Sequence, residues 1–195
     1  MQAALTLATF IIISLANVSI CFAKPSSSTQ QKIADTELKK ALKESINSAE
    51  SFTDRYDAEV WLVASSEKLK RYIKDPKERL SILQKIHHAA TRAELEPELV
   101  LAVIQIESAF NPYAVSRVGA QGMMQVMPFW KKEIGRPEDN LIDLETNLRY
   151  GSIILKHYLD LEKGHFANAL ARYNGSYGSY KYSRKVMDAW LDYWR

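Results

Sequence analysis

One carboxylate lies in an apolar setting that can tune its acidity. Residues 103 to 112 read V-I-Q-I-E-S-A-F-N-P, and Glu107 is the only charged residue among them. On a helix, the residues three, four and seven positions earlier share its face, and they are Ile104, Val103 and Val100. Burial penalises the charged form of a carboxyl, and so does the negative end of a helix dipole. The pattern therefore predicts a raised pKa for Glu107, as a general acid requires.

The residues after Glu107 and two later segments match the pattern of a known family. They read E-S-A-F-N-P-Y-A-V-S-R-V-G-A-Q-G-M-M-Q-V-M-P at 107 to 128, A-R-Y-N-G-S at 171 to 176, and Y-S-R-K-V at 182 to 186. Together they closely resemble the soluble lytic transglycosylase (SLT) family, in its order and with its spacings, over about residues 82 to 190. Without this context, a structural glutamate held in an ion pair or polar network would be favoured.

The resemblance implies an all-α, goose-lysozyme-like fold and a reaction on peptidoglycan. Members of the family cleave the β-1,4 bond between N-acetylmuramic acid and N-acetylglucosamine without adding water, which leaves a 1,6-anhydromuramic end. Glu107 would then protonate the glycosidic oxygen and later accept the proton of the C6 hydroxyl. Because the substrate's own acetamido group would stabilise C1, a second carboxylate is not required.

The resemblance also assigns a set of substrate-binding residues around the acid. Ser116 would contact the acetamido region or the acid, Gln125 would line the glycan cleft, and Tyr182 would orient the acid or the intermediate. A lone serine, glutamine or tyrosine would otherwise be read as an ordinary surface or core residue. The full set is Ser116, Met124, Gln125, Tyr173, Asn174 and Tyr182.

Two rival functions remain open at this stage. The first is a lysozyme-like hydrolase, in which a second carboxylate activates water. The residues that could supply this carboxylate are Glu133, Asp139, Asp143 and Glu145. The second rival is a non-catalytic glycan-binding protein, although binding alone would not need the acid.

Helical signals dominate the chain, and no run of alternating residues predicts a strand. Helices are expected at 33–50, 54–73, 75–93, from 97, 143–161, 166–173 and 183–194, with loops concentrated between Ala109 and Asn140. The predicted fold class is all-α, with a lysozyme-like catalytic domain at 81–195 and an N-terminal helical extension at 24–80. We expect this extension to contact the catalytic domain or to recruit a partner.

The first 23 residues carry no charge and end in C-F-A before Lys24, which predicts a secretory signal peptide at 1–23. An uncleaved membrane anchor stays open, because the segment also lacks the usual basic start. The expected location is outside the cytoplasm, in the periplasm. Cys21 is the only cysteine, so the mature chain would have no disulfide and no cysteine metal site. The adjacent His87 and His88 would point in different directions on a helix, and we expect no metal or cofactor.

Charge is mild and mixed along the chain. The formal net charge is +3 in 195 residues, and neither half carries a large excess of one sign. This balance argues against a nucleic-acid surface but suits an acidic polymer. The expected partners are peptidoglycan glycan strands, with cell-wall or secretion-machinery proteins as further candidates, and the oligomeric state is open.

Overall fold

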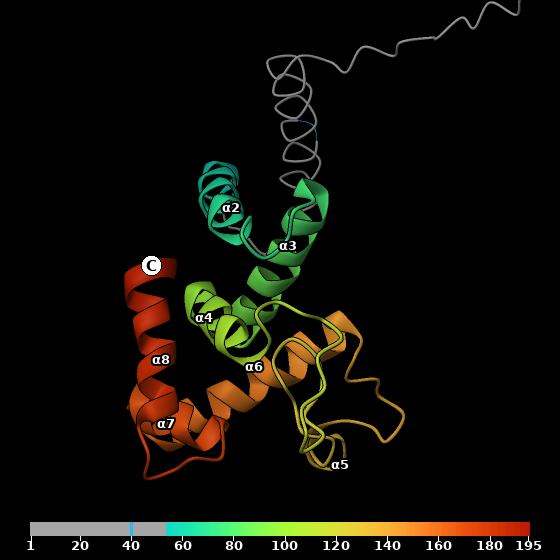
Figure 1. Ribbon diagram of the computed structural model, residues 1–195, viewed down its shortest axis with the longest axis vertical. Coiled ribbons are helices and arrows are strands. Elements are labelled where there is room, and N and C mark those ends of the chain that lie inside the picture. The colour runs from blue at the N-terminus through green and yellow to red at the C-terminus, as the bar shows by residue number, and fades with distance from the viewer. Residues whose placement is uncertain (1–39, 41–53) are drawn as a thin grey trace, which may run out of the picture.

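Helices make up the regular structure of the described chain. The computed structural model describes residue 40 and residues 54–195 (Figure 1). Extended backbone pairs in this part only at isolated bridges, which join Val115 to Gln121 and Gln121 to Val126. The predicted all-α fold is therefore confirmed. The elements are α2 (Arg55–Leu69), α3 (Pro76–Arg92), α4 (Pro97–Ser108), α5 (Trp130–Ile134), α6 (Leu144–Leu161), α7 (Phe166–Tyr173), α8 (Lys181–Ala189) and the π-helical turn η1 (Trp190–Trp194).

Short local signals fix where several helices begin. Asp54, Asp75 and Asp143 are the N-caps of α2, α3 and α6, and each carboxylate accepts a backbone N–H of the first turn. Pro76 and Pro97 begin α3 and α4, at a position where the missing N–H of proline costs no helical hydrogen bond. These starts agree with the predicted ones.

Three parts of the helix prediction differ from the structure. The helix predicted at 54–73 ends earlier, at Leu69. The region from Ala109 to Asn140, predicted as loop, contains the five-residue helix α5, which is too short to show a helical period. The helix predicted at 183–194 begins earlier, at Lys181, and its last turn widens into η1. Trp190 and Trp194 at the two ends of this turn are both buried, at 4% and 3% exposure.

The centre of the fold is α4. Its residues from Leu99 to Ile104 are at most 1% exposed, as expected for a helix that is apolar on all sides. α3, α8 and η1 all contact α4, and Figure 1 shows it among them. The end of α4 that carries Glu107 is therefore held by packing on several sides.

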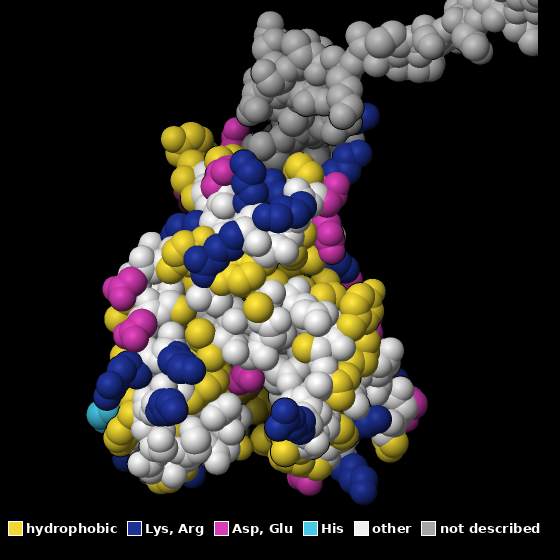
Figure 2. All heavy atoms as spheres, viewed as in Figure 1, with side chains coloured by type: hydrophobic (Ala, Val, Ile, Leu, Met, Phe, Trp, Pro, Cys, Tyr) yellow, Lys and Arg dark blue, Asp and Glu magenta, His cyan; other side chains and the backbone are white. Residues whose placement is uncertain are grey.

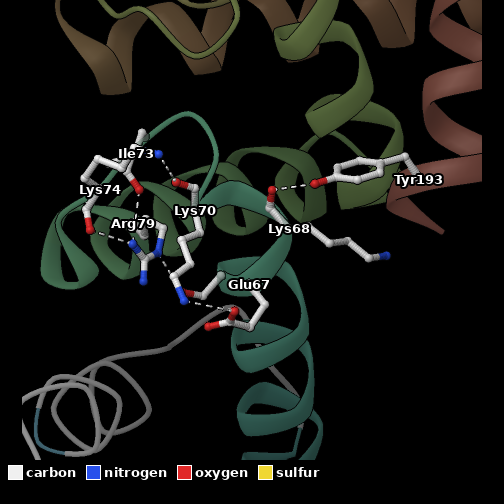
Figure 3. A network of polar contacts seen from close by, with 8 residues as sticks. Glu67, Lys68, Lys70, Ile73, Lys74, Arg79 and Tyr193 are labelled. Atoms are coloured by element: carbon white, nitrogen blue, oxygen red, sulfur yellow. Dashed lines mark hydrogen bonds and ion pairs between the residues drawn. The ribbon is translucent and has the colours of Figure 1, made fainter. Parts of the chain in front are cut away.

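Polar contacts hold α2 to both α3 and η1 (Figure 3). The buried guanidinium of Arg79 on α3 donates to Ser66 Oγ at 3.0 Å and to the carbonyl oxygen of Ile73 at 3.1 Å. From η1, the Tyr193 hydroxyl donates to the carbonyl oxygen of Lys68 at 2.6 Å. α2 is therefore bonded to α3, which precedes Glu107 in the sequence, and to η1, which follows Tyr182.

The predicted signal peptide at 1–23 lies outside the described residues, and so do residues 24–39 and 41–53 of the predicted extension. The described end of that extension is α2 and the start of α3. α3 runs across the predicted boundary at residue 80, with the buried Leu80 and Leu83 on its two sides. None of the helices in the described ranges is long and apolar enough to cross a membrane.

Candidate active site

α4 ends directly after Glu107. Glu107 is its second-to-last residue, and the two residues that follow the helix, Ala109 and Phe110, both have left-handed backbone, with φ of 50° and 65°. Residues other than glycine rarely adopt this backbone conformation, which costs about 1 to 3 kcal/mol at each such residue. Phe110 is held there by burial, since its ring lies 4.9 Å from that of Tyr72 and 5.5 Å from that of Trp194. The packing of Phe110 thus supports the strained turn that follows the acid.

The Glu107 carboxyl is buried and hydrogen-bonded. Burial raises its pKa from 4.5 to about 7, while hydrogen bonds from Tyr182 and Asn174 lower the pKa in part. The Tyr182 hydroxyl, which comes from α8, donates to Glu107 Oε1 at 2.6 Å. The direction of the shift agrees with the sequence prediction. Near neutral pH this carboxyl can therefore hold a proton and release it.

Two phenols lie close to the acid and stay protonated. Burial and the charge of Glu107 raise the pKa of both Tyr173 and Tyr182 well above the usual range. Tyr182 donates to the acid, whereas the Tyr173 hydroxyl donates to the carbonyl oxygen of Met124 at 2.7 Å. Tyr173 thus ties α7 to the motif loop, which we define as residues 113–126.

Ser116 and Gln125 are bonded within this motif loop. Ser116 Oγ accepts the backbone N–H of Ala120 at 3.0 Å. Gln125, whose own φ is 50°, donates its side-chain amide to the carbonyl oxygens of Ala114 at 3.1 Å and Gly122 at 2.9 Å. Both side chains therefore shape the loop in this structure.

A buried asparagine on α6 fastens the same loop. Asn147 is 1% exposed, and its amide donates to the carbonyl oxygens of Gln121 and Leu141, each at 2.8 Å. Its side-chain oxygen accepts the backbone N–H of Met124 at 2.8 Å. A Cβ on Gly122 would lie 2.3 Å from the Asn147 amide nitrogen, so only glycine fits beside it. Asn147 and Gly122 together set how close the loop approaches α6.

Met124 requires a correction. The sequence predicted a substrate contact, but its side chain is fully buried, at 0% exposure. It lies so close to Gly151 on α6 that any Cβ there would collide with its sulfur. A side chain without exposed surface lines no groove in this structure, so Met124 belongs to the core beneath the motif loop.

An open cavity of about 370 Å³ lies beside the acid, and we call it the Glu107 pocket. Of the predicted site residues it brings together Glu107, Asn174 and Tyr182, whereas Ser116, Gln125 and Tyr173 are not among its lining residues. Figure 2 shows one face of the molecule, which is hollowed between two lobes with Lys and Arg side chains on both. The lining residues are Ile106, Glu107, Asn174, Ser176, Ser179, Lys181, Tyr182 and Lys185.

The sequence analysis missed several residues of the site. Lys181 and Lys185 flank Tyr182 in the segment K-Y-S-R-K, so their nearness to a motif tyrosine was the available signal. Asn147 carried no such signal, because its partners are backbone groups elsewhere in the chain. Within the described residues no cluster of three His, Cys, Asp or Glu side chains could hold a metal ion.

Removing the Tyr182 hydroxyl should move the titration of Glu107. The hydrogen bond stabilises the carboxylate and lowers its pKa, so we expect Tyr182→Phe to raise the pKa above about 7. In an NMR titration of labelled glutamate the midpoint should shift upward. Tyr180→Phe is the matched control, since the Tyr180 hydroxyl donates to Asn168 Oδ1 at 3.0 Å and not to the acid. A midpoint that falls or stays put would contradict this account of the bond.

The raised pKa of Glu107 also predicts how stability depends on pH. A carboxyl with a folded-state pKa above its unfolded value destabilises the fold once it ionises, so stability is lost as pH rises from about 4.5 through 7. With about 1.4 kcal/mol for each pKa unit, this loss amounts to about 3 kcal/mol. Glu107→Gln cannot ionise and should not lose it.

Urea denaturation at pH 4 and pH 8 measures the effect. The difference in unfolding free energy between Glu107→Gln and the original protein should be larger at pH 8, in favour of the variant. Equal differences at the two pH values would mean that Glu107 titrates normally.

The sequence is similar to those of known lytic transglycosylases. Two proteins named membrane-bound lytic murein transglycosylase C, from Yersinia pestis (strain Pestoides F) and Yersinia pseudotuberculosis (serotype I, strain IP32953), are each 36% identical over 110 residues. The match covers 48% of this chain and 31% of each relative, so this chain spans less than a third of their length.

Among solved structures, the fold resembles that of an inactive mutant of the lytic transglycosylase Slt from Pseudomonas aeruginosa. The TM-score is 0.51 at 19% identity, over 88% of this chain and 37% of that one. The sequence model of the transglycosylase SLT domain family matches residues 84–189, which is more than half of the chain. The chain therefore belongs to the transglycosylase SLT domain family.

Proposed function

We propose that the protein is a peptidoglycan lytic transglycosylase with Glu107 as its single acid and base. The observation that carries the proposal is the placement of Glu107: a carboxyl with a pKa of about 7, bonded to Tyr182, on the wall of an open pocket. Membership of the family and the names of the relatives support the same substrate, peptidoglycan.

In the first step, protonated Glu107 transfers its proton to the glycosidic oxygen as the bond from C1 to that oxygen breaks. The carbonyl oxygen of the substrate's acetamido group bonds to C1 and forms an oxazolinium-like intermediate. The pKa near 7 suits this step, since a useful fraction of the carboxyl is protonated at neutral pH.

In the second step, the C6 hydroxyl attacks C1, the bond from C1 to the acetamido oxygen breaks, and ionised Glu107 accepts the hydroxyl proton. The Tyr182 hydroxyl, which donates to Oε1 at 2.6 Å, stabilises the carboxylate between the two steps. Asn174 is proposed to contact sugar from the same pocket. Tyr173, Ser116 and Gln125 remain proposed site residues, and their bonds to the motif loop give them a positioning part as well.

The rival hydrolase needs a second carboxylate near the acid, and its candidates are engaged elsewhere. Asp139 accepts from Tyr150 at 2.6 Å and from Arg149 at 3.1 Å, and its pKa is lowered by these bonds. Asp143 caps α6, and Glu145 pairs with Lys85. Neither these three carboxylates nor Glu133 belong to the lining of the Glu107 pocket. This arrangement favours the transglycosylase reaction over hydrolysis.

Digestion of purified sacculi, with mass analysis of the products, tests the proposal. We expect muropeptides with 1,6-anhydromuramic ends, which lack the water that a hydrolase adds. Products with only reducing muramic ends would replace the proposal with the hydrolase. Binding without any product would leave the non-catalytic glycan-binding protein.

We further propose that the protein is exported and acts in the periplasm, either free or held by an uncleaved N-terminal segment. The apolar residues 1–23 and the peptidoglycan substrate support this location. Cell fractionation should find the protein with the periplasm or the membrane, and deletion of residues 2–23 should leave it in the cytoplasm. A cytoplasmic full-length protein would contradict the proposal.

A further inference from the structure

Two lysines line the Glu107 pocket, and the proposed reaction gives them no task. Lys181 and Lys185 are four residues apart at the start of α8, so their side chains project from the same face of the helix. Both residues are exposed. Within residues 54–195, neither ammonium group forms an ion pair with a carboxylate. The pocket thus presents two positive charges beside the acid, and neither is paired with a carboxylate of the described residues.

A hydroxyl on the same wall also lacks a partner. Ser176 is among the residues that line the pocket, whereas its Oγ is buried and makes no hydrogen bond within the described part of the chain. The neighbouring Ser179 lines the pocket too, and both serines lie on the loop between α7 and α8. A buried hydroxyl without a partner is costly, and a serine hydroxyl can both donate and accept. On this side of the pocket the groups that can only donate are therefore the two ammonium groups.

A ligand that supplies acceptors and negative charge would complete this wall. Ammonium groups carry three donors and no acceptor, and they bind carboxylates with charge-assisted hydrogen bonds. A neutral sugar hydroxyl would form no ion pair with either lysine. The glycan on which the proposed function rests does carry carboxylates, either on the lactyl group of muramic acid or on the peptide stems attached to it.

We propose that Lys181 and Lys185 form a carboxylate-binding subsite that recognises the acidic groups of muramic acid units next to the scissile bond. This inference rests on the proposed function and names the part of the substrate that the pocket selects. Lys181 and Lys185 are here specificity-determining residues. They would distinguish peptidoglycan from a neutral polymer of N-acetylglucosamine with the same linkage.

Binding measurements in the Glu107→Gln background separate recognition from turnover. Three probes are compared by isothermal titration calorimetry with the full chain: neutral chitopentaose, peptide-free peptidoglycan strands with free lactyl carboxylates, and strands that carry peptide stems. Exposed charge pairs each contribute little, so we expect Lys181→Gln/Lys185→Gln to weaken binding of an acidic probe about three- to tenfold. Chitopentaose should bind equally with and without the two lysines.

The choice of probe identifies the source of the carboxylate. If the lysine variant loses affinity for peptide-free strands, the subsite binds the lactyl group. If it loses affinity only for peptide-bearing strands, the subsite binds the peptide stem. The loss should shrink at high salt, because screening weakens exposed ion pairs. The matched control Lys74→Gln/Lys77→Gln removes the same charge from exposed positions before and within the first turn of α3 and should change no affinity.

Two results would overturn the inference in distinguishable ways. Equal binding of all three probes by the lysine variant and its parent would remove the subsite but leave the proposed function in place. Failure of every probe to bind the Glu107→Gln protein would overturn the proposed function together with the subsite.

Discussion

Replacing Glu107 by glutamine should lower the turnover of peptidoglycan at least about thousandfold. One general acid or base contributes about 10² to 10⁴ in rate, and in the proposed reaction this carboxyl serves in two successive steps. Glutamine keeps the shape and can still accept the hydrogen bond from Tyr182, but it has no proton to give. The rate of anhydromuropeptide release from sacculi, followed by mass spectrometry, measures the loss.

The control is Glu98→Gln, which changes a carboxyl at the other end of α4. Glu98 accepts the indole N–H of Trp61 at 2.6 Å, and glutamine preserves that acceptor. Its turnover should stay near that of the original protein, and both variants should unfold cooperatively. If Glu107→Gln retained more than a tenth of the original rate, another group would have to supply the proton.

Asn147→Ala should destabilise the fold by about 3 to 5 kcal/mol. The substitution leaves the carbonyl oxygens of Gln121 and Leu141 and the backbone N–H of Met124 without their partner. Each buried polar group that loses its hydrogen bond costs about 1 to 3 kcal/mol, and partial access of water reduces the sum. Because the motif loop loses its bonds to α6, activity should fall as well.

Chemical denaturation followed by circular dichroism measures this cost. Asn140→Ala is the control, since its side chain accepts one backbone N–H in an exposed turn and should contribute under about 1 kcal/mol. Asn147→Asp tests the donors separately: it keeps an acceptor for Met124 but faces two carbonyl oxygens without an N–H. If Asn147→Asp were as stable as the original, the amide donors would not be what fastens the loop.

Much of the fold could be predicted because its signals are local. Asp75 followed by Pro76 defines a helix start from two residues alone, and the apolar run after Pro97 is long enough to require burial. The raised pKa of Glu107 follows from the same run, since the residues that bury the helix also bury the acid. Such conclusions need no knowledge of which other segments pack against the helix.

The predictions that failed or stayed untested concern contacts between distant segments. Met124 occurs in a motif with proposed substrate-binding residues, but whether a side chain faces the groove or the core depends on α6, which packs beneath it. Ser116 and Gln125 could form hydrogen bonds with sugar or with their own loop, and the sequence does not choose between these partners. Asn147 went unnoticed for the same reason, because its role lies in backbone groups up to 26 residues away.

The contacts of α2 and η1 bear on where the folding unit ends. The family match stops at residue 189, yet Trp194 on η1 packs against Phe110 and donates to Gln105, two residues before the acid, at 2.7 Å. At the other boundary, the buried Arg79 precedes residue 84. A polypeptide trimmed to residues 84–189 would keep the family motifs but lose Trp194, which contacts the end of α4, and Arg79, which bonds α3 to α2. The segment that the family model matches is therefore shorter than the part of the chain that packs around α4.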